Sequence, residues 1–294
     1  MVLYRWPDRQ PAATMTRHGT QGSPPIPHQG HPPLAVIHQD AQLLAVHKPA
    51  GLLVHRSLLD AHADTDVVTQ LRAQTGAPVW PVHRLDKGTS GLLLLARDAD
   101  SARRLGAAFA AGSSAADADG AVQKPTQNPV KKRYLALVRG WPDDAGEIAQ
   151  PLARDPELPS TGQPHLTALT RWRVLQRLAL PLATDARHAD TRLALLEVQP
   201  MTGRRHQIRR HLKALAHPLI GDASHGKGPL NRAIAAHVGH ARLWLHALAL
   251  TLPHPATGLA LALRADPGPE WAWLDWPRDA APAPGRSADE EPSA

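Results

Sequence analysis

The stretch Leu34 to His47, LAVIHQDAQLLAVH, contains two short apolar runs separated by only a few polar residues around Asp40. Each run has the length of a β-strand, and no helix fits between them. Strands that follow one another directly favour a mixed or antiparallel sheet with helices packed on it over a doubly wound parallel sheet. We therefore predict an α+β fold with a mixed, largely antiparallel central sheet.

Other runs of the sequence support this fold class. Apolar runs bounded by Pro, Gly or Asp predict strands, and longer amphipathic runs ended by Gly76 or Pro218 predict helices. The predicted strands are Leu34 to His38, Leu43 to His47, Leu92 to Arg97, Tyr134 to Arg139, Thr191 to Gln199 and Leu243 to Leu252. The predicted helices are Asp66 to Gln74, Asp100 to Phe109 and His206 to Ala216.

Three stretches lack periodicity and are rich in Pro, Gly, Gln, Ser or Ala, which is typical of disordered segments. They are residues 1–33, the stretch Ala110 to Pro129 and residues 277–294. We expect a disordered leader, a surface insertion at 110–130 and a disordered tail. The ordered domain would then span residues 34–276.

The composition points to a polyanionic partner. The formal net charge is +7 and the isoelectric point is near 10.2, so nucleic acid is the leading candidate. A solvated basic surface without a partner is the alternative. The chain has no cysteine, which excludes disulfides, thiolate metal sites and a cysteine nucleophile. Neither a membrane-length apolar run nor a secretory signal is visible, so we expect a soluble cytoplasmic protein.

One candidate for chemistry is the segment VHRLDKGTSG, from Val82 to Gly91, which precedes the run Leu92 to Leu95. Its carboxylate, Asp86, is flanked by Arg84 and a lysine on a turn that leads into an apolar strand. Such a turn presents a side chain at the rim of a sheet, where sites are often built. The alternative is an aspartate that only pairs with its basic neighbours or binds turn amides.

A second candidate is the segment TGRRHQIRRHLK, from Thr202 to Lys213, in which glycine leads into a helix dense in Arg, Lys and His. Cationic side chains and a helix N-terminus both attract phosphate. The residues Ile208, Leu212 and Leu215 recur at helical spacing, so one stripe should face the core. The other face can bind RNA or can be a solvated charge run.

The third candidate is KKRYLALVRG, from Lys131 to Gly140, in which Tyr134 follows a basic cluster at the start of a strand. An aromatic ring in this position can stack on a base, as in RNA-binding proteins, or can simply pack in the core. With two tyrosines and one phenylalanine in the chain, we do not expect an extended stacking surface.

Motifs for metals and cofactors are missing from the sequence. The histidines show no zinc-like spacing beside a carboxylate, and there is neither a phosphate-binding loop nor a dinucleotide glycine pattern. We therefore expect no metal and no cofactor.

Taken together, these segments resemble the RluA-type pseudouridine synthase family, in the family's order from about Leu34 to Trp276. The matching residues are HKPAGLLVH (His47 to His55), HRLD (His83 to Asp86) with Thr89, Ser90 and Gly91, Lys132 to Tyr134, Thr202 to Arg204 with His206 to Arg209, HPLIGD (His217 to Asp222), Leu245 to Ala247, His254 with Pro255, and Thr257 with Gly258. The chain departs from the family in having His47 where Asn or Asp is usual and in the insertion at 110–130.

The resemblance implies the isomerisation of uridine to pseudouridine in structured RNA, with neither metal nor cofactor. Asp86 is implied as the catalytic residue, either as nucleophile at the anomeric carbon or as base at the neighbouring ribose carbon. Arg209 is implied as its salt-bridge partner, Tyr134 as the ring that stacks on the target uracil and Ile208 as an apolar wall. Further RNA contacts are implied for Arg84, Arg204 and His206.

Within the family the chain most resembles the enzymes that modify uridine-65 of tRNA, through residues 55–60, Gly221 with Asp222, His225 with Gly226, and Asn231 with Arg232. The expected partner is thus tRNA, bound by a monomer. Three alternatives stay open: the same reaction on ribosomal RNA, a non-catalytic RNA-binding protein, and a metal-dependent nucleotide hydrolase.

Overall fold

In the computed structural model, residues 31–56, 64–111, 130–183 and 189–276 are described. Most of the predicted leader, insertion and tail lies outside these residues. The elements are β1 (Val36–Gln39), β2 (Leu43–Lys48), α1 (Val67–Thr75), β3 (Trp80–Pro81), β4 (Ser90–Ala96), α2 (Ala99–Ala111), β5 (Lys131–Arg139), β6 (Ala145–Ile148), β7 (Leu152–Ala153), β8 (His165–Leu166), β9 (Thr170–Leu180), β10 (Thr191–Pro200), α3 (Gln207–Ala214), α4 (Gly228–Val238), β11 (Leu245–Pro253), β12 (Ala260–Arg264) and the 3₁₀ turn η2 (Pro269–Trp271).

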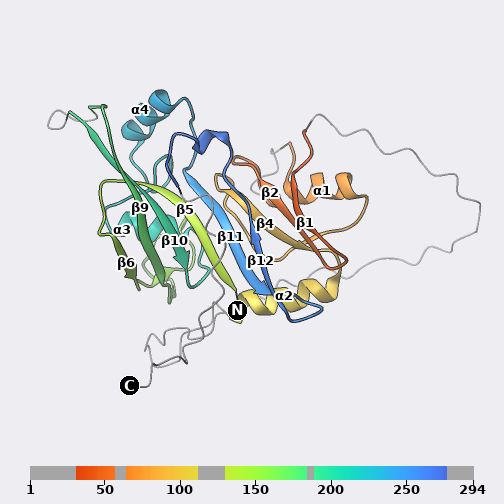
Figure 1. The fold of residues 1–294 in the computed structure, drawn as a ribbon. Coiled ribbons are helices and arrows are strands. Elements are labelled where there is room, and N and C mark those ends of the chain that lie inside the picture. The colour runs from red at the N-terminus through yellow and green to blue at the C-terminus, as the bar shows by residue number, and fades with distance from the viewer. Residues whose placement is uncertain (1–30, 57–63, 112–129, 184–188, 277–294) are drawn as a thin grey trace, which may run out of the picture.

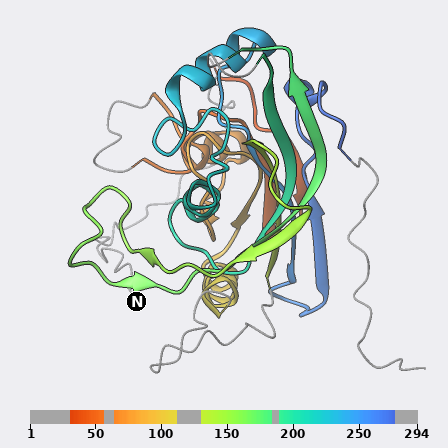
Figure 2. The ribbon, with the colours of Figure 1, turned by 90° about the vertical axis from the view of Figure 1, so that its left-hand side faces the viewer.

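Ten of the described strands form one curved sheet (Figures 1 and 2), and β7 and β8 form a separate two-stranded antiparallel sheet. The strand order of the larger sheet is β1-β2-β4-β11-β5-β10-β9-β6, with β12 paired to β11 and β3 paired to β4. The β4 and β11 strands run parallel, and the other pairs among the described strands are antiparallel. The predicted α+β class with a mixed, largely antiparallel sheet is confirmed.

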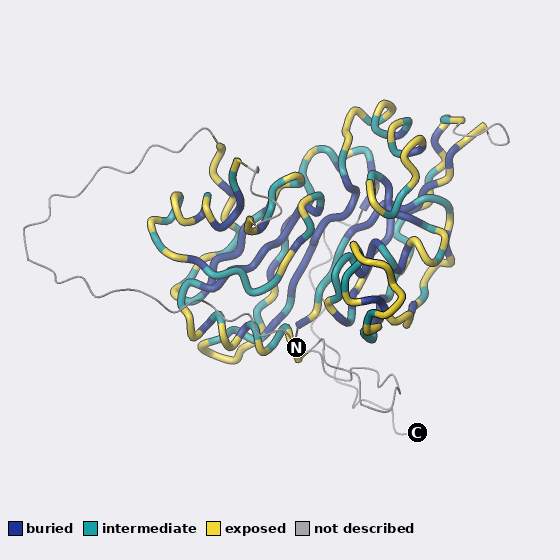
Figure 3. Tube along the Cα trace, turned by 180° about the vertical axis from the view of Figure 1, so that it is seen from behind, coloured by how far each residue is buried: buried dark blue, intermediate teal, exposed yellow. Residues whose placement is uncertain are grey.

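The centre of the sheet is buried on both faces, as the dark strands in Figure 3 show. In β4, Leu93 and Leu95 pack in one apolar cluster with α1. The intervening Leu92 and Leu94 pack in another cluster with Leu105 of α2. Successive strand residues point to opposite faces, so a run of four leucines fits a strand that is covered on both sides.

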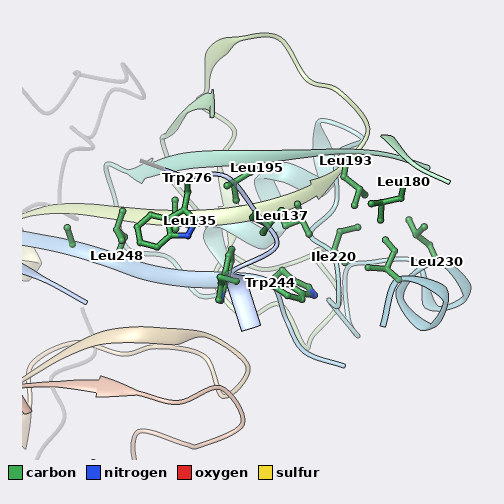
Figure 4. Packing of buried hydrophobic residues seen from close by; sticks show 14 residues of the cluster. Leu135, Leu137, Leu180, Leu193, Leu195, Ile220, Leu230, Trp244, Leu248 and Trp276 are labelled. Atoms are coloured by element: carbon green, nitrogen blue, oxygen red, sulfur yellow. The ribbon is translucent and has the colours of Figure 1, made fainter. Parts of the chain in front are cut away.

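The β5 and β10 strands repeat this arrangement. One face carries a cluster with α3 that contains Ile208 and Leu212, as the helical spacing of these residues predicts. The other face packs against α4 and against Trp244 and Trp276 (Figure 4). Because α1 and α3 share a cluster partner in Tyr134, they cover the same face of the sheet.

The six predicted strands and three predicted helices all form, with ends shifted by a few residues. Asp66 caps α1 by accepting from the Thr69 amide, and Gly76 ends the helix in the left-handed conformation. The predicted insertion begins too early, because Ala110 and Ala111 complete α2. No described helix is long and apolar enough to cross a membrane.

The longest strand, β9, and the helix α4 are missing from the predicted elements. The pairing of β9 with β10 shifts register between Val174 and Gln176, which leaves Leu175 as an extra residue. A bulge of this kind interrupts the alternation of polar and apolar residues by which a strand is identified.

A close backbone approach between β4 and β11 occurs at Gly91. Its φ is +109°, and a Cβ there would lie 2.3 Å from the Ala247 carbonyl oxygen. We expect Gly91→Ala to lower the free energy of unfolding by about 2–3 kcal/mol, because it adds strain in the backbone and a clash with β11.

The control for this prediction is Gly76→Ala, since Gly76 also has a positive φ but no atom within 4 Å of the added Cβ. Urea unfolding should show a loss of about 1 kcal/mol for this control, the cost of placing a Cβ in the left-handed region. Equal losses for the two variants would contradict the clash with β11.

Candidate active site

Asp86 lies in the loop between β3 and β4, next to the strand that the sequence marks most clearly. The Thr89 amide donates to the Asp86 carbonyl, which closes a turn just before β4. Leu85 is buried and anchors the loop, whereas the Asp86 side chain keeps 28% of its surface exposed. The turn therefore presents the carboxylate at the rim of the sheet, as predicted.

A buried lysine, Lys48, holds this loop through hydrogen bonds to backbone carbonyls. The Nζ of Lys48, which is fully buried, donates to the carbonyls of Pro49, Leu52 and Lys87 at 2.8, 2.7 and 3.2 Å. The Gly51 amide also donates to the Lys87 carbonyl. Lys48 thus ties the end of β2 to the residue that follows Asp86, a role that the sequence did not reveal.

The predicted salt bridge between Asp86 and Arg209 is present. Arg209 lies in α3, and its Nη1 donates to Asp86 Oδ2 at 2.9 Å. The two residues are 123 positions apart in the chain. The side chain of Arg209 is 9% exposed, so the pair lies partly shielded from water, where charge interactions are screened less than at an open surface.

Arg209 has a second carboxylate partner, Asp222, which was not predicted. Its Nε and Nη2 donate to the two oxygens of Asp222 at 2.7 and 2.9 Å, and the Asp222 side chain is fully buried. Asp222 also accepts from the amides of Ser224 and His225. A bidentate pair of this kind fixes the plane of the guanidinium and so aims Nη1 at Asp86.

The charge state of Asp222 follows from these contacts. Burial by itself would raise its pKa, but the hydrogen bonds from Arg209 and from the His225 amide outweigh burial and hold the pKa below its usual value. Asp222 is therefore ionised at neutral pH and stays paired with Arg209.

Two cavities meet at Asp86. The smaller, of about 450 Å³, is lined by Tyr134, Ile208, Arg204 and His206 among others, and the larger, of about 1200 Å³, extends past Arg84 toward α4. Asp86, Arg84, His206 and Arg209 line both cavities. The structure thus brings all seven predicted site residues to the walls of these cavities.

The basic residues near the site are in two different situations. Several are engaged within the protein: Arg133 pairs with Glu197, Arg205 pairs with Asp155 and Glu157, Arg204 Nε donates to the Thr167 carbonyl and Lys132 Nζ donates to the Thr202 carbonyl.

In contrast, Arg84, Lys87 and Arg232 form no ion pair with the described residues. These three line the larger cavity and are available to an anionic ligand.

Comparisons with known proteins agree on one family. The model of the family described as RNA pseudouridylate synthase matches residues 42–214. The tRNA pseudouridine synthase C of Vibrio cholerae is 39% identical over 246 residues, which cover 82% of this chain and 94% of that protein. The protein of the same name from Salmonella typhimurium is 40% identical over 249 residues, which cover 81% and 87%.

This chain belongs to the RNA pseudouridylate synthase family. A solved structure named human RNA pseudouridylate synthase domain containing 1 shares its fold, with a TM-score of 0.59 and 24% identity over 80% of this chain and 84% of that one. The geometry around Asp86 therefore has to be interpreted in terms of the isomerisation of uridine to pseudouridine.

Two further residues hold the family's sequence motifs in place. The side chain of Gln207 accepts from the Arg204 amide and donates to the Leu169 carbonyl and the Thr170 hydroxyl, which ties the loop before α3 to the start of β9. Similarly, His246 in β11 bonds to Ser90 through Nδ1 and donates from Nε2 to the Ala265 carbonyl. Both residues are buried, so we assign them to the scaffold of this RNA pseudouridylate synthase rather than to its chemistry.

Proposed function

We propose that this chain isomerises uridine-65 of tRNA to pseudouridine, with Asp86 as the group that acts on the ribose. The observation that carries the proposal is the ion pair of Asp86 with Arg209 at the junction of two open cavities.

The reaction breaks the bond between the ribose C1′ and the uracil N1, turns the base and joins C1′ to C5. The product has the same atoms as the substrate, so no group is gained or lost overall. Because the base is detached and rejoined, the reaction needs a reactive side chain and a pocket that retains the detached uracil. Asp86 can attack C1′ as a nucleophile or can remove a proton from the neighbouring ribose carbon. In either case Arg209 holds the carboxylate in a fixed orientation.

We assign the smaller cavity to the uracil. A nucleotide within folded RNA has to be flipped out of its stack to reach Asp86, at a cost of a few kcal/mol. Tyr134 offers an aromatic face and Ile208, which is 6% exposed, offers an apolar wall. Burial and the nearby charge of Asp86 both raise the pKa of Tyr134, so its hydroxyl keeps its proton and the ring acts by stacking.

This assignment predicts that Tyr134→Phe retains most of the activity, because stacking requires the ring and not the hydroxyl. Tyr134→Ala, in contrast, should bind the flipped nucleotide about 1–3 kcal/mol more weakly. Single-turnover rates on a tRNA transcript would measure both effects. An inactive Phe variant would show that the hydroxyl takes part in the reaction.

We assign the larger cavity to the RNA on either side of the flipped nucleotide. Arg84, Lys87 and Arg232 line this cavity and form no ion pair within the described part of the chain, so they can take phosphates and release the counterions of the RNA. Arg84 lies two residues before Asp86 and is exposed. It can fill the gap left by the flipped base or hold the phosphate of that nucleotide.

The choice of tRNA as substrate is supported by relatives that are named tRNA pseudouridine synthase C and cover most of this chain. Mapping pseudouridine in tRNA and ribosomal RNA from cells that lack this gene tests the choice. We expect position 65 of tRNA to lose the modification while ribosomal RNA is unchanged. Loss in ribosomal RNA alone would overturn the assignment. The monomeric state and cytoplasmic location stay predictions.

A further inference from the structure

His206 is an unusual residue at the junction of the two cavities. It precedes α3 in the left-handed conformation, with φ at 54°, and its side chain makes no capping hydrogen bond to the helix. Left-handed backbone at a residue other than glycine is energetically unfavourable and clusters at functional sites. The ring instead points to the catalytic loop, where its Nε2 lies 3.9 Å from Asp86 Oδ1, and 17% of the side chain is exposed.

The charged groups around His206 come from each neighbouring element: Asp86 from the catalytic loop, Arg205 from the adjacent position, Arg209 from α3, and Asp222 with His225 from the loop before α4. Burial lowers the pKa of His206 most strongly. Asp86 raises it, and the two arginines lower it further, so the net shift is downward. The imidazole is therefore neutral at pH 7 and can accept a proton.

A second imidazole, that of His225, lies close enough to His206 to receive such a proton. The Nδ1 of His206 lies 3.4 Å from Nε2 of His225. The position of His225 is fixed by its amide, which donates to Asp222 Oδ1 at 2.8 Å. His225 is partly exposed, so it can exchange protons with water.

Besides the step at the ribose, the isomerisation requires that a base remove a proton from the uracil. Once C5 has bonded to C1′ it still carries its hydrogen, which has to leave as a proton. The pair of electrons from that bond restores the double bond between C5 and C6, and N1 regains its lone pair and takes up a proton. The carbon that loses the proton is one bond from C1′, the atom on which Asp86 acts.

We propose, on the basis of the function proposed above, that His206 is a catalytic base that removes the proton from C5 of the rearranged uracil. Nε2 accepts the proton, and Nδ1 passes its own proton to His225. The proposal holds for either role of Asp86, because the C5 proton is lost after the new bond has formed.

The other basic groups of the smaller cavity are less suited to this step. His83 accepts the Leu94 amide through Nε2, and burial lowers its pKa to about 3. Burial lowers the pKa of Lys132 to about 8, which still leaves it mostly protonated at pH 7. Tyr134 keeps its proton for the reason given above. His206, in contrast, lines this cavity with a ring nitrogen 3.9 Å from Asp86 Oδ1.

The test is His206→Asn, measured in single turnover on a tRNA transcript containing either ordinary or 5-deuterated uridine. Asparagine tolerates the left-handed backbone but is not a base. We expect the rate to fall by about 100-fold to 10,000-fold and the variant to be slower on the deuterated substrate, because loss of the C5 proton has become rate-limiting. An unchanged rate, or a lower rate without a deuterium effect, would overturn the proposal.

Two controls complete the experiment. His237→Asn makes the same change at an exposed histidine of α4 and should keep the full rate. His206→Gly accepts the backbone conformation freely, and added imidazole should restore part of its activity. Failure of imidazole to restore it would count against a base at this position. A wild-type protein that forms no pseudouridine would instead refute the proposed function.

Discussion

Asp86→Asn is expected to abolish pseudouridine formation while RNA affinity stays within about tenfold of the wild-type value. The amide has nearly the same shape as the carboxylate, but it can neither attack C1′ nor take a proton from the ribose. It can still accept a hydrogen bond from Arg209, so the loop and both cavities should persist. Single-turnover assays and filter binding on the same transcript would measure the two quantities.

The matched control for this prediction is Asp143→Asn. Asp143 is exposed, lies outside both cavities, and its side chain makes no ion pair with the described residues. This variant should retain the wild-type rate. Substantial activity in Asp86→Asn would contradict the assignment of Asp86, whereas a large loss of affinity would mean that the carboxylate mainly organises RNA binding.

Arg209→Met is expected to have the largest effect on stability, with the free energy of unfolding lowered by about 3–5 kcal/mol. The substitution keeps much of the side-chain volume but leaves Asp222 charged and fully buried without its cation. The amides of Ser224 and His225 still donate to Asp222, but they carry no net charge. Urea unfolding would measure the loss, and activity should disappear together with the orientation of Asp86.

Arg171→Met provides the comparison, because Arg171 pairs with Glu147 at a site where both side chains are more than 40% exposed. An exposed pair contributes about 0–1 kcal/mol, so this variant should unfold near the wild-type urea concentration. If Arg209→Met were as stable as Arg171→Met, the ion pairs of Arg209 with Asp222 and Asp86 would not contribute to stability as expected.

The sequence allowed the central strands to be predicted because burial on both faces leaves a clear signal. The four leucines of β4 form such a signal, and the short gap between β1 and β2 indicates that these two strands pair directly. The β9 strand has three arginines and a bulge at Leu175, so it lacks regular alternation. The helix α4 has a proline in its first turn and Gly239 at its end. These are signals of a helix start and a helix end, but they were not used to predict this helix.

The site was predictable only in part, for a physical reason. Asp86 and Arg209 come from segments 123 residues apart, and no local pattern indicates that they meet. Their pairing was expected from the family resemblance alone. The bidentate pairing of Asp222 with Arg209 and the orientation of the His206 ring depend on where the loop before α4 packs against α3. Such tertiary contacts have no signature in the spacing of the residues.

A single-turnover assay with enzyme in excess over a tRNA transcript, run alongside a transcript that has cytidine at position 65, tests the target uridine and the role of Asp86 together. The account predicts pseudouridine at position 65 of the first transcript, none in the second, and none in either with Asp86→Asn. Equal product from both transcripts would refute the target position, and product formed by Asp86→Asn would refute the role of the carboxylate.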